Sequence, residues 1–248
     1  MEVERINPYR NGGDKTEQVE RMFDSIAPAY DFMNSAMSFG QNHKWRNIAL
    51  KDAIASLKSD TDISILDVAT GTGDVAFRLN RLMPRALITG IDLSEGMLGV
   101  AREKLAKLPT GRQEKLAFGK ADSLSLPYHD STFDMITVAY GVRNFSNLSK
   151  GLKEMKRVLK HDGIVCIIEL SCPTGKIISS LYKFYSGILI PWAGKLVSGD
   201  HRAYKYLPES IEACPQRDEM SSLLYEAGFS SVRWKSLSFG AVTYYIAS

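Results

Sequence analysis

The stretch Ile63-Ser64-Ile65-Leu66-Asp67-Val68-Ala69-Thr70-Gly71-Thr72-Gly73-Asp74 decides how the rest of the chain is interpreted. Its first half is a short apolar run rich in branched residues, which is typical of a buried parallel strand. The Gly71-Thr72-Gly73 that follows lets the backbone turn sharply before a helix that we expect to begin near Val75. Strand, glycine turn and helix together predict a ligand-binding loop.

This loop differs from the dinucleotide-binding motif. The third glycine of that motif is missing, because Ala76 falls three positions after Gly73. Acidic side chains, Asp67 and Asp74, flank the loop. These carboxylates would repel a pyrophosphate, whereas they would attract the ammonium and sulfonium groups of S-adenosylmethionine. The loop therefore favours S-adenosylmethionine over NAD or ATP as the cofactor.

Acidic residues also follow the next two predicted strands. Asp92 ends the strand 86–91, about 20 residues beyond the glycines, where a carboxylate can accept hydrogen bonds from both ribose hydroxyls. Asp122 follows the strand 116–120 and could accept a hydrogen bond from the adenine amino group. The alternative for Asp122 is a solvated turn residue. Because ligands of doubly wound sheets lie outside the carboxyl ends of the strands, we expect these groups to share one site.

Length and composition fit one α/β domain that spans residues 1–248. The net charge of +3 is too small to indicate nucleic-acid binding, and no Lys/Arg cluster interleaved with aromatic residues is present. The three cysteines lack CxxC spacing, and the four histidines include no i, i+4 pair. We therefore predict no metal site and a reducing compartment.

The amino terminus, Met1–Arg5, is charged and lacks an apolar signal core. No uninterrupted apolar run of about 18 residues is found in the sequence. We expect a cytoplasmic protein, and its mild positive charge would help it to visit the anionic inner face of the cell membrane. Self-association into a homo-oligomer remains open.

Strands and helices alternate along most of the chain, which predicts a doubly wound, mostly parallel sheet. A final hairpin is expected to add an antiparallel strand at the edge. Besides the first strand, the expected strands are 86–91, 116–120, 133–138, 163–170, 231–237 and 241–246, and the expected helices are 74–82, 95–107, 147–160 and 217–227.

Two regions lie outside this alternation. Residues 1–57 form an N-terminal helical segment, whose first dozen residues are polar and expected to be mobile. Its aromatic- and methionine-rich part, 27–38, is either an adaptable apolar lid or core packing between short helices. Residues 172–215 form an apolar insertion, either a subdomain core or a channel or membrane-touching surface for an apolar substrate.

Several motifs, in a fixed order along nearly the whole chain, carry a specific resemblance. They are Tyr30-Asp31-Phe32-Met33-Asn34, Gly71-Thr72-Gly73-Asp74, Gly141-Val142-Arg143-Asn144, Arg157-Val158-Leu159-Lys160, Glu169-Leu170-Ser171 and Tyr204-Lys205-Tyr206-Leu207-Pro208-Glu209-Ser210-Ile211. The chain resembles class I S-adenosylmethionine-dependent methyltransferases, and among them the C-methyltransferases of menaquinone and ubiquinone biosynthesis, the UbiE/MenG family. The resemblance implies a Rossmann-like, seven-stranded α/β fold.

The resemblance also implies an activity, which is methylation of a ring carbon of a prenylated quinol with S-adenosyl-L-methionine as cofactor. We favour demethylmenaquinol, in the last step of menaquinone biosynthesis, and the equivalent benzoquinol of the ubiquinone pathway stays open. By the resemblance, Thr72, Asp92, Asp122 and Ser123 take cofactor-binding roles. With the loop residues, the predicted cofactor site consists of Asp67, Gly71, Thr72, Gly73, Asp92, Asp122 and Ser123.

The chain departs from the family pattern at three places. Asn42 stands where the first signature has a histidine, and His43 follows one position later, so we assign His43 no catalytic role. Ala139 replaces a small hydroxyl residue that contacts the cofactor in some relatives. His161-Asp162-Gly163 replaces the usual Pro-Gly-Gly turn, which we interpret as a structural change only.

Arg143 is the candidate catalytic residue. A phenolic hydroxyl ionises near pH ~10, by analogy with tyrosine, so a nearby cation is needed to favour the nucleophilic phenolate. A guanidinium stays charged in a partly buried site. Asn144 would position the ring, and Tyr30 and Asp31 are expected to close over the ring or the cofactor. The alternative is that Arg143 and Asn144 merely fix the loop after the strand.

Two other functions agree less well with the sequence. A nicotinamide-dependent oxidoreductase is disfavoured by the missing third glycine and the acidic loop. A catalytically inactive, methyltransferase-like assembly partner of a membrane biosynthetic complex is disfavoured by the intact loop and by Arg143 and Asn144.

Overall fold

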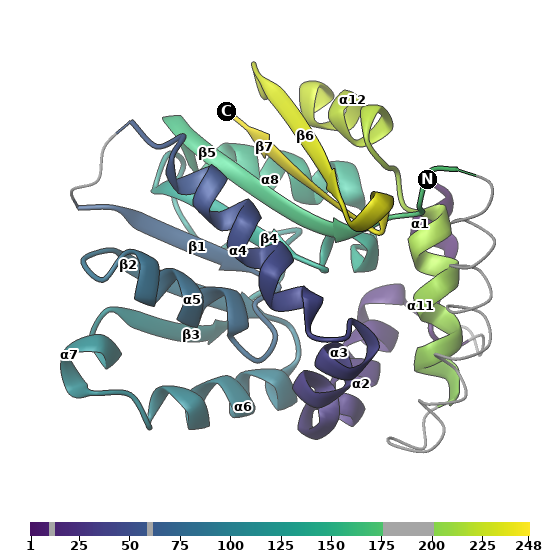
Figure 1. Ribbon diagram of the computed structural model, residues 1–248, viewed down its shortest axis with the longest axis horizontal. Helices are drawn as coiled ribbons and strands as arrows, with labels where there is room; N and C mark the ends of the chain where they lie inside the picture. The colour runs from purple at the N-terminus through teal and green to yellow at the C-terminus, as the bar shows by residue number, and fades with distance from the viewer. Residues whose placement is uncertain (10–12, 59–61, 176–200) are drawn as a thin grey trace.

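A computed structural model describes residues 1–9, 13–58, 62–175 and 201–248, the last range without the side chains of 201–204. Its centre is a seven-stranded sheet with the order β3-β2-β1-β4-β5-β7-β6 (Figure 1). Strands β1 to β5 run parallel, and β7 is antiparallel to both β5 and β6. The strands are β1 (Ser64–Val68), β2 (Leu87–Asp92), β3 (Leu116–Lys120), β4 (Phe133–Ala139), β5 (Leu159–Leu170), β6 (Val232–Leu237) and β7 (Val242–Ala247). The predicted doubly wound, mostly parallel sheet is confirmed, but the expected place of the antiparallel strand is wrong: β7 lies between β5 and β6 rather than at the edge.

Helices cover both faces of the sheet, as the near-continuous apolar strands require. On one face, Leu66 and Val68 of β1 pack with α8 (Leu148–Val158) and α12 (Asp218–Glu226). On the other, Ile65 packs with α4 (Gln41–Ile54) and α5 (Asp74–Leu82). Figure 1 shows α4 and α5 in front of the sheet and α8 behind it. Helices α6 (Glu95–Leu105) and α7 (Thr110–Gln113) lie beside β3.

The glycine turn after β1 forms as expected. Gly71 and Gly73 have positive φ angles of 58° and 83°, which side-chain-bearing residues rarely adopt. A Cβ atom on Gly73 would lie 2.7 Å from the Phe77 ring and 2.8 Å from the Phe118 ring. Gly73 is the residue before α5, which begins at Asp74. Both conformation and space therefore require glycine at this turn.

The expected boundary between the helix 147–160 and the strand 163–170 is wrong. Helix α8 ends at Val158 and β5 begins immediately at Leu159, so His161-Asp162-Gly163 lies within a strand rather than in a turn. The pairing of β4 with β5 shifts register between Phe133 and Met135. A Cβ on Gly163 would lie 2.9 Å from the Asp134 carbonyl oxygen. The irregularity needs glycine because the two backbones approach closely there.

The first residues are docked, so the expectation that they are mobile is wrong for residues 1–9. They include a short helix, α1 (Glu2–Arg5), in which Val3 is fully buried. Glu4 Oε1 accepts a hydrogen bond from the Leu148 backbone N–H at 2.9 Å. Lys15 Nζ donates to the Val3 carbonyl oxygen at 2.6 Å. The segment caps α8 and contacts the short helix η2 (Val142–Asn144).

Four further elements lie beyond the carboxyl ends of the parallel strands (Figure 1). They are α2 (Lys15–Ile26), η1 (Ala27–Ala29), α3 (Tyr30–Met37) and α11 (His201–Ala213). Much of the predicted insertion 172–215, namely 176–200, lies outside the described residues, so its interpretation stays a prediction. Among the residues that the structure describes, none of the helices has the length and apolar character needed to cross a membrane.

Candidate active site

Three cavities meet at the carboxyl ends of the strands, and the side chains of Tyr30 and Tyr140 border all of them. We call them the apolar cavity, the cofactor cleft and the polar pocket. Tyr140 follows β4 with a φ of 60°, a strained conformation for a bulky residue. Such strain clusters at functional sites, because the surrounding structure must be built to hold it.

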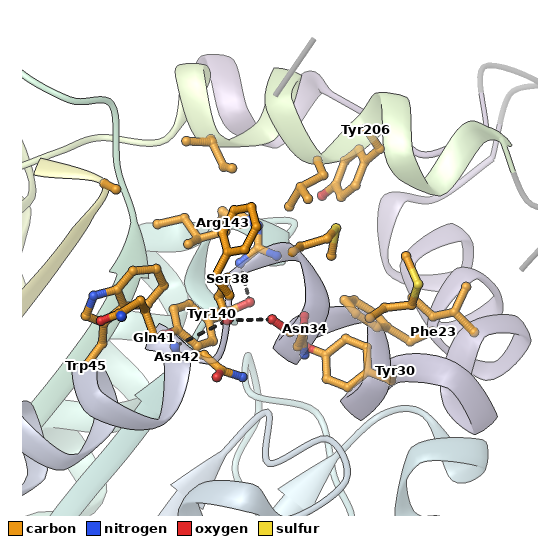
Figure 2. Close-up of a pocket in the computed structure, with 18 of the residues that line it drawn as sticks. Phe23, Tyr30, Asn34, Ser38, Gln41, Asn42, Trp45, Tyr140, Arg143 and Tyr206 are labelled. Atoms are coloured by element: carbon orange, nitrogen blue, oxygen red, sulfur yellow. Dashed lines mark hydrogen bonds between the residues drawn. The ribbon is translucent and has the colours of Figure 1, made fainter. Parts of the chain in front are cut away.

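The apolar cavity has a volume of about 350 Å³ and lies between α2, α3 and α4 on one side and α11 on the other (Figure 2). Figure 2 shows Arg143 between Tyr206 of α11 and the aromatic side chains Tyr30 and Trp45. The wall is mostly apolar, and its members include Met22, Phe23, Ile26, Met33, Met37, Phe39, Trp45, Leu170, Leu207 and Ile211. The interpretation of 27–38 as part of an apolar site therefore fits the geometry.

The cofactor cleft is lined by residues that end four neighbouring strands. Gly71 follows β1, Asp92 ends β2, Ser123 follows β3 and Asn144 follows β4. The structure thus brings together four of the predicted site residues. Asp122 does not line the cleft, and its Oδ1 accepts a hydrogen bond from the Leu124 N–H at 2.8 Å. This contact matches the turn alternative for Asp122, and its adenine contact stays a prediction.

Asp92 ties the glycine loop to the end of β2. Its Oδ2 accepts from the Gly71 N–H at 2.8 Å, and its Oδ1 accepts from the Ser94 N–H at 2.9 Å. Burial raises the pKa of Asp92 above its ordinary value, although the backbone N–H groups oppose the shift. Each carboxylate oxygen has a second lone pair, so the group can still accept from a ribose.

The polar pocket lies under the glycine loop, where Asp67 and Arg46 are both buried. The oxygens of Asp67 accept from Thr70 Oγ1 at 2.5 Å and from Thr137 Oγ1 at 2.6 Å. Burial raises the pKa of Asp67 to about 6, and the two hydroxyls oppose that shift. At neutral pH the pocket therefore holds a carboxylate, as the sequence predicted.

Asp74 also borders the polar pocket, but its charge is already paired within the protein. Its carboxylate pairs with Arg46 Nη1 at 2.8 Å and with Lys104 Nζ at 3.3 Å. Lys104 also pairs with Asp31 at 2.5 Å, and Thr72 Oγ1 donates to the second oxygen of Asp31 at 2.5 Å. The sequence argument counted Asp74 as a free negative charge beside the loop. The structure neutralises that charge with two cations, so the attraction of a cationic ligand depends on Asp67.

Arg143 is buried at the floor of the apolar cavity (Figure 2). Its Nη1 pairs with Glu169 Oε1 at 2.7 Å and also donates to the Tyr140 carbonyl oxygen. Burial acts to lower the pKa of the guanidinium, but the Glu169 charge outweighs it and the pKa is raised. Arg143 therefore stays a cation, and the neighbouring carboxylate offsets much of its charge.

Asn144 makes two contacts within the protein. Its Nδ2 donates to the Tyr140 carbonyl oxygen at 3.3 Å, and its Oδ1 accepts from the Tyr206 hydroxyl at 3.0 Å. Beneath it, Lys15 Nζ donates to the Arg143 carbonyl oxygen at 3.2 Å. These bonds tie η2 to α11 and α2, so both the catalytic prediction and the loop-fixing alternative for Asn144 remain.

Helix α2 closes the cofactor cleft from above. Asp24 Oδ1 accepts from Ser94 Oγ at 2.6 Å and from the Gly96 N–H at 2.9 Å, at the start of α6. Glu20 pairs with Lys120 at 2.6 Å. The cleft beneath α2 retains a free volume of about 70 Å³. The N-terminal helices thus occupy the place of the predicted lid.

Buried polar atoms without a hydrogen-bond partner gather at this site. Within the described ranges, four buried side-chain nitrogen or oxygen atoms lack a partner: Asn7 Oδ1, Arg46 Nε, Tyr140 Oη and Arg143 Nε. Three of them belong to residues that border the cavities. Because leaving such atoms unpaired costs about 1–3 kcal/mol each, this concentration points to a polar ligand.

Sequence reasoning missed Arg46, Tyr140, Lys15 and Asp24. A signal for Arg46 existed, since it precedes Ala49, Leu50 and Ala53 at helical spacing and therefore lies on the buried face of α4. An arginine on a buried helix face is uncommon and needs a partner. No metal-binding group of three His, Cys, Asp or Glu side chains is present among the residues searched, which are those the structure describes.

Comparisons with known proteins agree with this geometry. A family model described as the ubiE/COQ5 methyltransferase family matches residues 12–248. A demethylmenaquinone methyltransferase of Bacteroides fragilis is 48% identical over 246 residues, which cover 99% of this chain and 98% of that protein. A ubiquinone/menaquinone biosynthesis C-methyltransferase UbiE of Geobacter sulfurreducens is 38% identical, with coverages of 97% and 91%.

Solved structures share the fold at low identity. The [4+2]-cyclase SpnF superposes with a TM-score of 0.66 at 20% identity, covering 91% of this chain and 76% of that one. A SAM-dependent methyltransferase from Aquifex aeolicus has a TM-score of 0.56 at 21% identity, with coverages of 82% and 87%. These similarities establish the Rossmann-like class I methyltransferase fold.

Proposed function

The chain belongs to the ubiE/COQ5 methyltransferase family, and we therefore infer that it methylates a ring carbon of a prenylated quinol with S-adenosyl-L-methionine. The reaction is a step of menaquinone or ubiquinone biosynthesis. Relatives named demethylmenaquinone methyltransferase favour demethylmenaquinol as the substrate and menaquinol as the product. The ubiquinone-pathway benzoquinol is the second candidate, because other relatives carry both pathways in their names.

The residues of the cofactor cleft and polar pocket fit S-adenosyl-L-methionine. Asp92 would accept hydrogen bonds from the ribose hydroxyls, and Ser123, which lines the cleft after β3, would lie beside the adenine. Asp67 would attract the ammonium group, in the polar pocket under Gly71. The Thr72 hydroxyl donates to Asp31 and keeps its lone pairs for a donor of the cofactor, and Gly73 shapes the loop, with its N–H bonded to the Thr70 carbonyl oxygen.

The apolar cavity fits the prenylated quinol. Its volume of about 350 Å³ and its apolar wall can take an aromatic ring and the first part of an isoprenoid tail. The single observation that carries the proposal is that this cavity meets the cofactor cleft at Tyr30 and Tyr140. A ring in the first cavity would therefore lie next to a donor in the second.

Bound S-adenosyl-L-methionine supplies a methyl group on a positively charged sulfur. The protein supplies alignment and an environment for the phenolate. Arg143 lines the apolar cavity and has an unpartnered Nε, so it can stabilise the phenolate oxygen. Asn144 holds Tyr206 and the end of η2 in place, which orients Arg143 and the cavity wall. Tyr30 borders both cavities and would close over the ring and the donor, and Asp31 would act on the glycine loop through its hydrogen bond from Thr72 Oγ1.

The test is methyl transfer by the purified protein to a prenylated naphthoquinol and to the matching benzoquinol, each followed by mass spectrometry. We expect methylated naphthoquinol in excess of methylated benzoquinol. Binding of S-adenosylhomocysteine without methylation of either quinol would favour the inactive assembly partner. Stabilisation by NADH instead of S-adenosylhomocysteine would favour the oxidoreductase.

We also propose contact with the inner face of the membrane at the mouth of the apolar cavity. Phe39 is 82% exposed and Phe239 is 77% exposed, both with positive φ, and Trp45 Nε1 links their two turns by donating to Ser238 Oγ at 2.8 Å. Exposed aromatic rings favour the membrane interface. Sedimentation with anionic vesicles should weaken in the Phe39→Ser and Phe239→Ser variants but not in Phe32→Ser, an exposed control on α3. Self-association stays a prediction.

A further inference from the structure

Arg46 is an unusual side chain in the polar pocket. It is only 4% exposed, although it carries a full positive charge, and it comes from α4 rather than from the sheet. Its Nη1 pairs with Asp74 at 2.8 Å, and its guanidinium lies over the Tyr140 ring at 5.4 Å from the ring centre. In the described part of the chain, its Nε has no hydrogen-bond partner.

The ion pair with Asp74 does not account for the burial of Arg46. Asp74 already has a second cation, Lys104, which also pairs with Asp31. Burying a guanidinium and leaving one of its N–H groups unpaired costs free energy that a structural ion pair alone does not recover. The remaining N–H therefore fits an acceptor that arrives from outside the chain.

The pocket that Arg46 lines has charges of both signs. Asp67 is a buried carboxylate, and Arg46 is a buried cation whose Nε–H has no partner among the described residues. Asp74 also borders the pocket, but its carboxylate is paired with Arg46 Nη1 and with Lys104. An α-amino acid group carries an ammonium and a carboxylate on one carbon atom. The Asp67 carboxylate is complementary to the ammonium group, and the unpaired Nε–H of Arg46 is complementary to the carboxylate.

We propose that Arg46 binds the carboxylate of the methionyl part of the cofactor and sets the preference for ligands that carry it. The proposal deepens the proposed function and rests on it. In this arrangement Asp67 takes the ammonium and Arg46 the carboxylate. Arg46 acts on binding and on the placement of the methyl donor, and it does not touch the quinol.

The test compares two ligands that differ by this one group. Decarboxylated S-adenosylmethionine keeps the ammonium, the sulfonium and the nucleoside, and lacks only the carboxylate. Calorimetry without quinol should give an affinity of the natural protein for S-adenosylmethionine about 10- to 100-fold higher than for the decarboxylated form. In Arg46→Gln this ratio should fall to below about 3-fold, and Arg46→Lys should restore part of it.

Arg78→Gln is the matched control. Arg78 is a half-buried arginine of α5 that interacts with Asp74 and does not line the pocket. Arg78→Gln removes one positive charge near Asp74, as Arg46→Gln does. It should leave the ratio of the affinities for S-adenosylmethionine and its decarboxylated form unchanged. Retained affinity of Arg46→Gln for decarboxylated S-adenosylmethionine shows that the variant is folded.

The other results of the calorimetry distinguish the role of Arg46 from the proposed function. An unchanged ligand ratio in Arg46→Gln would overturn the proposal while leaving the proposed function intact. Equal loss of affinity for both ligands would also overturn it, because Arg46 would then act only on the structure of the loop. If the natural protein bound neither ligand, the proposed function itself would fail.

Discussion

The cofactor cleft and the apolar cavity share Tyr30 and Tyr140 but are built in different ways. The cleft is made of residues that end neighbouring strands, so their places follow from the sheet topology. The apolar cavity is assembled from α2, α3, α4, α11 and the turn before β7, which the sheet does not order. A short motif can therefore identify the cofactor, whereas the substrate site depends on how distant segments pack together.

The largest expected effect is on catalysis, at the polar group of the apolar cavity. Arg143→Ala should lower kcat at least ~100-fold, because one group that stabilises the oxyanion is lost. The affinity for S-adenosylmethionine should change little, since Arg143 does not line the cofactor cleft. Steady-state kinetics measures kcat, and calorimetry on the same preparation measures the Kd for S-adenosylmethionine.

A folding control is needed for that variant, because it leaves the buried Glu169 unpaired. The double variant Arg143→Ala/Glu169→Gln removes this charge and should regain thermal stability without regaining kcat. Near-normal kcat in either variant would show that Arg143 only fixes the loop. Arg102→Ala, on the exposed face of α6, should leave kcat unchanged.

The second effect is confined to the cleft. Asp92→Ala should raise the Kd for S-adenosylmethionine about 10- to 100-fold, because two ribose hydroxyls lose a charged acceptor and the glycine loop loses its anchor at Gly71. Unlike Arg46→Gln, Asp92→Ala should weaken the binding of S-adenosylmethionine and of its decarboxylated form by the same factor. Calorimetry with both ligands checks this, and unchanged binding would refute the ribose contact.

The third effect is confined to the apolar cavity. Ile211→Trp should fill part of the cavity and raise KM for a prenylated quinol about 10-fold, as overpacking of a defined site predicts. Cofactor affinity should stay the same, because Ile211 does not border the cofactor cleft. Equal changes of KM for quinols with and without the tail would show that the tail lies elsewhere.

The smallest effect is a pH dependence of cofactor binding. Burial raises the pKa of Asp67 to about 6, so the carboxylate is ionised at pH 7.5 and becomes protonated as the pH falls through 6. Protonation removes the attraction for the ammonium group, so the Kd for S-adenosylmethionine should rise about 3- to 10-fold as the pH falls from 7.5 to 5.5. 5′-Methylthioadenosine, which lacks the amino acid, should show no such change. An equal pH dependence for both ligands would contradict the role of Asp67.

The contrast between the two regions also explains what the sequence could predict. The glycine turn and Asp92 could be predicted because each depends on local chemistry and on its place at the end of a strand, whereas Ser123 was expected only from the family resemblance. The neutralisation of Asp74 could not be predicted, because its partners Arg46 and Lys104 lie 28 and 30 residues away along the chain. The acidic residues of the loop indicate the correct cofactor, S-adenosyl-L-methionine, although the charge of Asp74 is paired within the protein.

Long-range packing accounts for the other differences. Residues 1–9 looked mobile because they are polar, but Val3 fills a pocket beside α8 and Lys15 holds its carbonyl group. His161-Asp162-Gly163 looked like a turn, but pairing with β4 extends β5 through it. Local propensity gave the wrong structure in both places because tertiary contacts override it.

The contacts of Asp24 and Glu20 with the start of α6 and with Lys120 have a kinetic consequence. Because α2 lies over the cofactor cleft, exchange of the cofactor requires these contacts to break while the sheet stays intact. Helix displacements of this kind take microseconds to milliseconds, and product release limits turnover in many enzymes. We therefore expect the dissociation rate of S-adenosylhomocysteine, rather than its affinity alone, to increase with ionic strength and in Asp24→Ala.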